Sequence, residues 1–324
     1  AFYNFNTPEF NVNVCQLPFW ALSILYAWRC IKFNKFLDYA LLGLFMAFGI
    51  LSKYLFAYLM IGIAIFFIHT FIKEKKFRFG SFITTFVFVV ILTPHLIWMV
   101  NNDFITIAYG LKRTAVEPSA FNHVINPLIF LVKQIGVLGL FFLMIYFLVS
   151  KLETKIKWND PKLLFLLSVT VVPVFFVFLT SLVLGARIRT MWTTPFYLTL
   201  GLLTLYIFED YINKKKLKNF YYLFIFIFLL SPSLYLYVSI SKDNKRTDYP
   251  GYAIAKEIEV RFGKNIKKVS GDEWHAGNLS YHLKSRPTWV GYKQDFNNGI
   301  CFSEFPPKDF SIGIPKNTEV CLEK

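Results

Sequence analysis

Two long apolar runs, residues 36–51 and 54–72, are separated only by Ser52 and Lys53. As one continuous helix they would be about 55 Å long, at about 1.5 Å per residue. Because the hydrocarbon core of a bilayer is about 30 Å thick, the chain must cross it twice and turn near Lys53. A lysine at that depth is costly unless its ammonium reaches water or meets an anion. Lys53 is therefore either a snorkelling residue at a hairpin tip or a ligand for the phosphate of a lipid-linked substrate.

The composition agrees with a chain that crosses the membrane many times. The sequence is 55% hydrophobic and 19% aromatic, which is typical of polytopic membrane proteins rather than soluble ones. The predicted fold class is an all-α polytopic bundle with a small external α/β domain at the C-terminus. Eight spans are predicted, at residues 14–31, 36–51, 54–72, 79–100, 124–149, 163–184, 192–211 and 220–240.

The net charge of +15 is distributed unevenly between the connections. Alternate connections carry fifteen basic residues on one face and five on the other, which is the positive-inside pattern of an inner-membrane protein and argues against nucleic-acid binding. The basic-rich connections are predicted to be cytoplasmic and to meet anionic membrane lipids. The fifteen residues are Arg29, Lys32, Lys35, Lys73, Lys75, Lys76, Arg78, Lys151, Lys155, Lys157, Lys162, Lys214, Lys215, Lys216 and Lys218.

The other connections are then predicted to face the outside of a bacterial plasma membrane. They are the N-terminal loop, the turn at Lys53, the long loop 101–123, the turn 185–190 and the C-terminal tail. The chain begins at Ala1 within a polar loop and without a methionine. We therefore expect a longer natural protein that has a further N-terminal segment.

The composition changes after about residue 241, which divides the chain into a transmembrane domain, residues 1–241, and a small domain, residues 242–324. Within the second domain we predict a helix at 249–262, a strand at 266–270, a helix at 273–283 and a strand at 319–322. Cys301 and Cys321 both fall in this domain. An oxidising external compartment would allow them to form a disulfide, which we state as a hypothesis.

Polar residues of the types that catalyse reactions or bind ligands gather at the predicted external ends of the spans. His95 follows the helix-bending Pro94, and the loop 101–123 is long for a compact bundle, as functional loops often are. Arginines at a membrane surface suit phosphate oxygens, but together with tryptophan they also anchor helix ends, and both readings stay open. The candidate phosphate ligands are Lys53, Lys112, Arg113, Arg187 and Arg189, and the candidate substrate-orienting residues are Asn13, His95, Tyr109 and Trp192.

A catalytic carboxylate is harder to assign. Outside the tail, the predicted external face offers only Glu9, Asp103 and Glu117, of which Glu9 and Asp103 are the candidate catalytic residues. The chain has no Walker loop, dinucleotide-binding fingerprint, paired CxxC motif or nucleophile elbow. The histidines are scattered, so no histidine metal cluster is predicted.

With these residues placed, the chain resembles the bacterial protein O-mannosyltransferases and aminoarabinose transferases, which form glycosyltransferase family 39 and its relatives and have the GT-C fold. The order and spacing of several short motifs carry the resemblance across almost the whole chain. They are Phe10-Asn-Val-Asn-Val-Cys-Gln-Leu-Pro-Phe-Trp20, Gly49-Ile-Leu-Ser-Lys-Tyr54, Pro94-His95 with Trp98, 104–109, Arg189 with Trp192 and Pro195, and Gly271-Asp-Glu-Trp-His-Ala-Gly-Asn278 followed by Arg286-Pro287.

The resemblance implies an inverting membrane enzyme of the cell envelope. It would take a sugar from a polyprenyl-phosphate carrier and pass it to a lipid, glycan or protein acceptor. It places Lys53, and as a second candidate Arg189, near the carrier phosphate. The family's catalytic acid would lie upstream of Ala1, and Asn13 occupies a position that is often acidic. This departure leaves the acid–base assignment and the need for a divalent metal open.

Two other functions fit a chain of this kind. A secondary transporter or flippase would carry ionisable groups near the middle of its spans, whereas here Lys133 is the main such residue. A non-catalytic assembly subunit would need no catalytic base. An acidic residue in the upstream loop would favour the enzyme.

Overall fold

The computed structural model describes residues 11–117, 119–150, 157–241, 248–272, 274–291, 299–302 and 320–323. By their internal contacts, the residues form two compact units, Ala1–Ser233 and Leu234–Lys324. The first unit is made of helices, and the second contains a small mixed sheet. The predicted class, a helical membrane protein with a small α/β domain at its C-terminal end, is confirmed.

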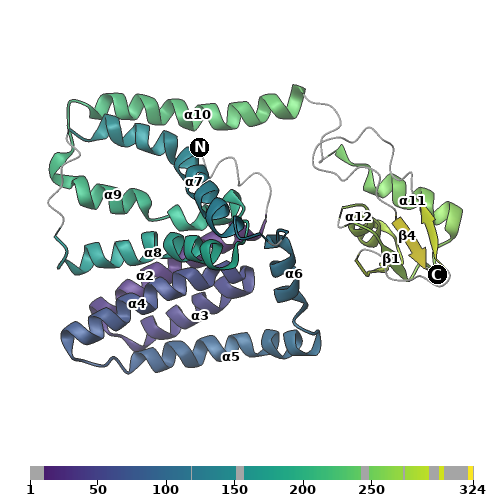
Figure 1. Ribbon diagram of the computed structural model, residues 1–324, viewed down its shortest axis with the longest axis horizontal. Coiled ribbons are helices and arrows are strands. Elements are labelled where there is room, and N and C mark those ends of the chain that lie inside the picture. Colours follow the sequence, from purple (N-terminus) through teal and green to yellow (C-terminus); the bar gives the residue numbers. More distant parts are fainter. Residues whose placement is uncertain are drawn as a thin grey trace. The chain divides into compact units, whose positions relative to one another are not determined.

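The first unit is built from long apolar helices joined by short connections (Figure 1). In chain order the elements are α2 (Val12–Phe33), α3 (Phe36–Ser52), η1 (Tyr54–Phe56), α4 (Ala57–Glu74), α5 (Gly80–Asn101), α6 (Ile105–Thr114), α7 (Asn122–Leu148), α8 (Pro161–Leu184), η2 (Thr190–Tyr197), α9 (Leu200–Phe208), η3 (Glu209–Tyr211) and α10 (Leu217–Ser241).

Six helices of the described chain are long and apolar enough to cross a membrane, and a bent pair of helices would be a seventh. The run predicted as one span at 192–211 is this bent pair, with an angle of 51° between residues Thr190–Tyr197 and Leu200–Tyr211. Pro195 lies within the 3₁₀ segment, and proline cannot donate a backbone hydrogen bond to a regular helix. The predicted second span forms α3, which at 17 residues is shorter than the others.

The connection predicted as a loop at 101–123 contains a helix that the sequence analysis missed. This is α6, ten residues long. Its apolar residues, among them Ile105, Ile107 and Leu111, are exposed together with Lys112 and Arg113. A short helix with exposed apolar residues and a basic last turn is typical of segments that lie along a membrane surface.

Contacts between connections support the predicted alternation of the two ends of the bundle. Among the basic-rich connections, Lys73 Nζ donates to Asn159 O at 3.2 Å and Asn213 N donates to Leu148 O at 2.9 Å. At the other end, Arg187 N donates to Thr114 O at 3.1 Å. Connections that we assigned to one face therefore contact one another, as a bundle with alternating spans requires.

Beyond the end of α10, the described part of the second unit has two helices and a four-stranded sheet. The helices are α11 (Gly251–Phe262) and α12 (His275–His282), and the strands are β1 (Lys268–Ser270), β2 (Thr288–Trp289), β3 (Ile300–Phe302) and β4 (Val320–Glu323). The strand order is β2-β1-β4-β3, with β1 parallel to β2 and the other pairs antiparallel. Both predicted helices are present, and the two predicted strands form β1 and β4, the central strands of the sheet, whereas β2 and β3 were not predicted.

A disulfide links the two C-terminal strands. Cys301 on β3 lies directly opposite Cys321 on β4, with 4.0 Å between their Cα atoms, and the two sulfurs are bonded. The hypothesis that these cysteines pair is confirmed. The two other cysteines, Cys15 and Cys30, are free thiols.

Candidate functional site

The turn at Lys53 is fixed by its backbone. Lys53 has an extended conformation that ends α3, and its carbonyl accepts hydrogen bonds from Phe56 N at 3.0 Å and from Gln16 Nε2 at 2.8 Å. Gly49 makes the tight turn possible, because a Cβ at this position would lie 2.4 Å from the Phe56 ring. Gln16 is completely buried, so its amide attaches the turn to α2 in the interior of the bundle.

The Lys53 side chain is held by two residues that are distant in the sequence. Its Nζ donates a 2.6 Å hydrogen bond to Asn13 Oδ1 and lies 4.9 Å from the centre of the Trp192 ring. An ammonium group has three donors, and a tryptophan face attracts it. Burial lowers the pKa of Lys53 from its usual value to about 7. The bond to Asn13 uses one donor, so two remain for an anion.

The next residue, Tyr54, joins three elements. Its hydroxyl lies 2.7 Å from His95 Nε2 on α5 and 2.7 Å from Thr106 Oγ1 on α6. The His95 ring stacks on Trp98, with 5.8 Å between the ring centres. His95 thus meets a tyrosine beside the Lys53 turn, and the start of α6 is attached to the same place.

The 3₁₀ segment that carries Trp192 is anchored by α7. The buried Gln134 Oε1 accepts hydrogen bonds from Thr193 Oγ1 at 2.9 Å and from the Tyr197 hydroxyl at 2.7 Å. The Trp192 backbone N–H donates to Arg189 O at 3.0 Å. Gln134 therefore anchors the segment that carries Trp192. Arg189 lies three residues before Trp192 in the chain.

Of the predicted site residues, the structure brings Lys53, Asn13 and Trp192 into contact, with His95 one residue further through Tyr54. The other candidates are exposed on neighbouring segments. Arg113 lies over the ring of Tyr109, with 5.6 Å to the ring centre. Asp103 is exposed in a left-handed turn, and Glu9 is outside the described residues. The other three predicted phosphate ligands, Lys112, Arg187 and Arg189, are exposed.

Comparison with known proteins gives a family match, which covers the segment that contains the Lys53 turn. Residues 1–98 match the family model of dolichyl-phosphate-mannose-protein mannosyltransferases. No curated protein and no solved structure matches the chain. The matched segment contains Asn13, Lys53 and His95, which are three of the residues around the turn. The match supports a membrane glycosyltransferase of the GT-C type, with a lipid-linked sugar donor in general terms.

The described residues contain no group of three His, Cys, Asp or Glu side chains that could hold a metal ion.

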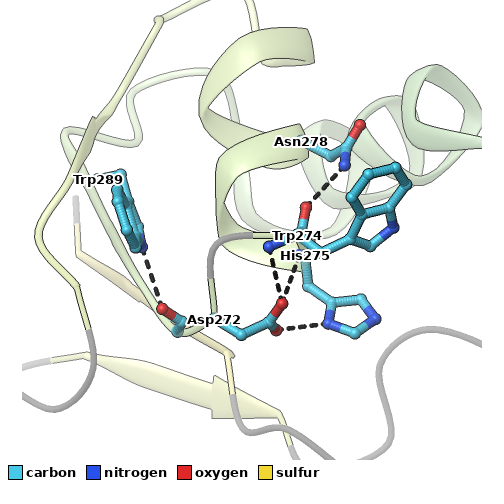
Figure 2. Close-up of polar contacts among 6 residues, drawn as sticks. Asp272, Trp274, His275, Asn278 and Trp289 are labelled. Atoms are coloured by element: carbon cyan, nitrogen blue, oxygen red, sulfur yellow. Dashed lines mark hydrogen bonds and ion pairs between the residues drawn. The ribbon is translucent and has the colours of Figure 1, made fainter. Parts of the chain in front are cut away.

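A second polar cluster lies in the C-terminal unit (Figure 2). Asp272 Oδ1 accepts from the backbone N–H groups of Trp274 and His275 at 2.8 and 3.0 Å, and Asp272 Oδ2 meets His275 Nδ1. Asp272 and His275 are both almost completely buried. A carboxylate that accepts the first amides of a helix is an N-terminal cap, so we assign the cluster to stability rather than to chemistry.

Gln16, Tyr54 and Gln134 also build the site, and none of them was among the predicted site residues. A signal for two of them was present, because uncharged amides inside apolar spans are expensive unless they are hydrogen-bonded within the protein. Tyr54 had no such signal, since tyrosine is common wherever a span meets the membrane surface.

Proposed function

We propose that this protein is an inverting glycosyltransferase that moves a sugar from a polyprenyl-phosphate carrier to a lipid, glycan or protein acceptor. The observation that carries the proposal is the position of the Lys53 ammonium at the end of the bundle, where Asn13 and Trp192 hold it. The bond to Asn13 uses one of its three N–H donors. Mannose is the first donor sugar to test, because the matching family model is named for mannosyl transfer.

The Lys53 ammonium would act on the leaving group. As the bond between the anomeric carbon and the phosphate oxygen breaks, the carrier phosphate gains negative charge. A fixed cation within hydrogen-bond distance of that oxygen stabilises the transition state more than the ground state, and no proton needs to be transferred. Asn13 and Trp192 would hold the ammonium in place before the donor binds. Arg189 is a second candidate ligand for the same phosphate.

The acceptor step requires a base. The acceptor oxygen would attack the anomeric carbon from the face opposite the phosphate, which inverts that centre, while a carboxylate takes its proton. Asp103 and Glu9 are the candidate bases in this chain. Asn13 is an amide and cannot accept the proton at neutral pH.

We further propose that the Lys53 end of the bundle faces the outside of a bacterial plasma membrane. The fifteen basic residues in the opposite connections support this orientation. The disulfide between Cys301 and Cys321 supports an external, oxidising location for the C-terminal unit.

The test follows the sugar–phosphate bond of the donor. Full-length protein in proteoliposomes receives polyprenyl phosphate that carries a radiolabelled mannose, together with a membrane extract as acceptor. We expect label to leave the carrier fraction and to appear on an acceptor. A transporter or flippase would move the intact donor across the bilayer, so label that crosses the membrane while staying on its carrier would contradict the proposal.

A further inference from the structure

A groove runs between α3, α4 and α5, along α4 from Met60 to the connection that joins α4 to α5. Its cavity volume is about 320 Å³, within the range of small-molecule sites. The groove exists because α4 packs mainly on α8 while α5 packs mainly on α3. Gly43 on α3 lets α5 approach so closely that a Cβ there would lie 2.4 Å from Thr84 O. Helices α4 and α5 are thus joined by a short connection but diverge beyond it.

One wall of the groove is a continuous apolar stripe of α4. The stripe consists of Met60, Ala64, Phe67, Ile68 and Phe71. Their spacing of three and four residues places them on one helix face. From first to last they extend about 16 Å, at about 1.5 Å per residue. This length is close to half of the hydrocarbon core of about 30 Å, which is the depth of one leaflet.

The polarity of the groove changes along its length. At the end near the α4–α5 connection it is lined by Arg78 and by Ser81, Thr84 and Thr85 of the first turns of α5. The hydroxyls of Thr84 and Thr85 donate to backbone carbonyls and keep their lone pairs as acceptors. The deeper part is lined by aliphatic and aromatic side chains such as Met46 and Met60. This order of polarity matches that of a phospholipid. The charged end corresponds to the phosphate, the hydroxyl-bearing residues to the glycerol, and the apolar part to the acyl chain.

The rim of the groove carries positive charge. Residues 73–78 contain four basic side chains and one acid. Arg78 Nη2 pairs with Glu74 Oε2 at 2.8 Å. Lys75 and Lys76 are exposed on the same connection, and Lys73 Nζ donates to Asn159 O. Basic pockets between transmembrane helices at this depth attract anionic headgroups.

We propose that this groove binds one anionic glycerophospholipid, with an acyl chain along the α4 stripe and the phosphate at Arg78. The charged end of the groove, at Arg78, lies beyond the end of α4 that is opposite Lys53, and neither Lys53, Asn13 nor Trp192 lines the groove. The proposed lipid site is therefore distinct from the proposed donor site and does not depend on the proposed function. A zwitterionic lipid would leave the positive rim uncompensated and is expected to bind less tightly.

Native mass spectrometry of the full-length protein in detergent tests this proposal. The protein is exchanged into phosphatidylglycerol, phosphatidylcholine or polyprenyl phosphate before analysis. We expect one phosphatidylglycerol to be retained at least tenfold more often than phosphatidylcholine. Arg78→Met should abolish this preference, whereas Lys162→Met, which removes an exposed charge from another basic connection, should keep it.

A second pair of variants tests the groove without changing any charge. Ala64→Trp fills the groove from an exposed position and should release the lipid, whereas Ile65→Trp, next to it on α4 but outside the groove lining, should not. Equal retention of phosphatidylglycerol in wild type, Arg78→Met and Ala64→Trp would overturn the proposal. Retained polyprenyl phosphate that Ala64→Trp displaces and Arg78→Met does not would also overturn it, because the groove would then hold a carrier tail.

Discussion

The Lys53 ammonium donates a 2.6 Å hydrogen bond to the side-chain oxygen of Asn13, a residue forty positions earlier in the chain. Gln16, one turn further along α2, holds the backbone of the same lysine. Two neighbouring amides of α2 thus fix both the position and the direction of Lys53. A snorkelling lysine needs no such support, since its flexible stem finds water unaided. The contacts therefore favour a bound anion as the reason for its position.

The pH dependence of the reaction should report the charge of Lys53. Burial lowers its pKa to about 7, so the ammonium is present below pH 7 and is lost as the pH rises through that value. A carrier phosphodiester stays singly ionised throughout this range. We expect kcat/KM for the donor, which reports the free enzyme, to fall about tenfold for each pH unit above 7.

Lys53→Arg provides the control for this profile. Arginine keeps its charge at all accessible pH values, so the fall above pH 7 should disappear even if the activity itself is lower. A profile of Lys53→Arg that still falls above pH 7 would assign the titration to another group.

Gln134 should act as a positioning residue through Trp192. Gln134→Leu removes a buried acceptor to which Thr193 Oγ1 and the Tyr197 hydroxyl both donate, and each lost hydrogen bond costs about 0.5–1.5 kcal/mol. We expect a lower melting temperature and a several-fold higher KM for the donor. Gln134→Glu keeps an acceptor oxygen and should restore KM.

The control for this prediction is Thr204→Val, because the Thr204 hydroxyl bonds only to Leu200 O of its own helix. A Gln134→Leu protein that melts earlier but keeps the wild-type KM would limit Gln134 to a structural role.

The carboxylate of Asp272 should stabilise the C-terminal unit. Asp272→Ala removes the cap of α12, at a cost of about 1–2 kcal/mol. It also removes the contact between Asp272 Oδ2 and the buried His275 Nδ1, and a lost hydrogen bond to a charged group costs about 1.5–3 kcal/mol more. Hydrogen exchange should show faster exchange of the α12 amides. Glu323→Ala, which breaks only a surface pair with Lys268, should cost less than 1 kcal/mol, and equal effects of the two variants would contradict the assignment.

Thiol labelling of intact cells tests the orientation. The Cys301–Cys321 disulfide should resist a membrane-impermeant maleimide, whereas Cys321→Ser frees Cys301 for labelling from outside. A Cys15→Ser background removes the partly exposed thiol, and Cys30 is buried. Lys75→Cys, in a basic connection, should react only after permeabilisation. The reverse pattern would place the C-terminal unit in the cytoplasm.

The sequence predicted the helical class because long apolar runs have few alternatives in a bilayer. The sequence was less informative where an apolar run is interrupted by polar residues or proline. The break between η2 and α9 involves Pro195 and the hydrogen bonds of Thr193 and Tyr197 to Gln134 of α7. Helix α6 lies in a stretch too short and too polar to be a span. Both features depend on partners distant in sequence.

The candidate site was predictable in part. Lys53 was identified because a charge between two apolar runs is expensive, and Trp192 because it follows two arginines. Their contact was not predictable, since helices that are apolar on all sides do not reveal which face turns inward. The same limit applies to Asn13 and Gln16, whose direction became clear only from their hydrogen bonds to the turn.

The most direct test of the central claim is the transfer rate of Lys53→Ala in the full-length protein, measured beside Lys162→Ala, which removes an exposed lysine from the opposite end of the bundle. Loss of one fixed donor to a developing charge typically lowers the rate about 10²–10³-fold. We predict a loss of this size for Lys53→Ala, with an unchanged melting temperature, and wild-type rates for Lys162→Ala. A Lys53→Ala protein that transfers sugar at the wild-type rate would contradict the assignment of Lys53 to the donor phosphate.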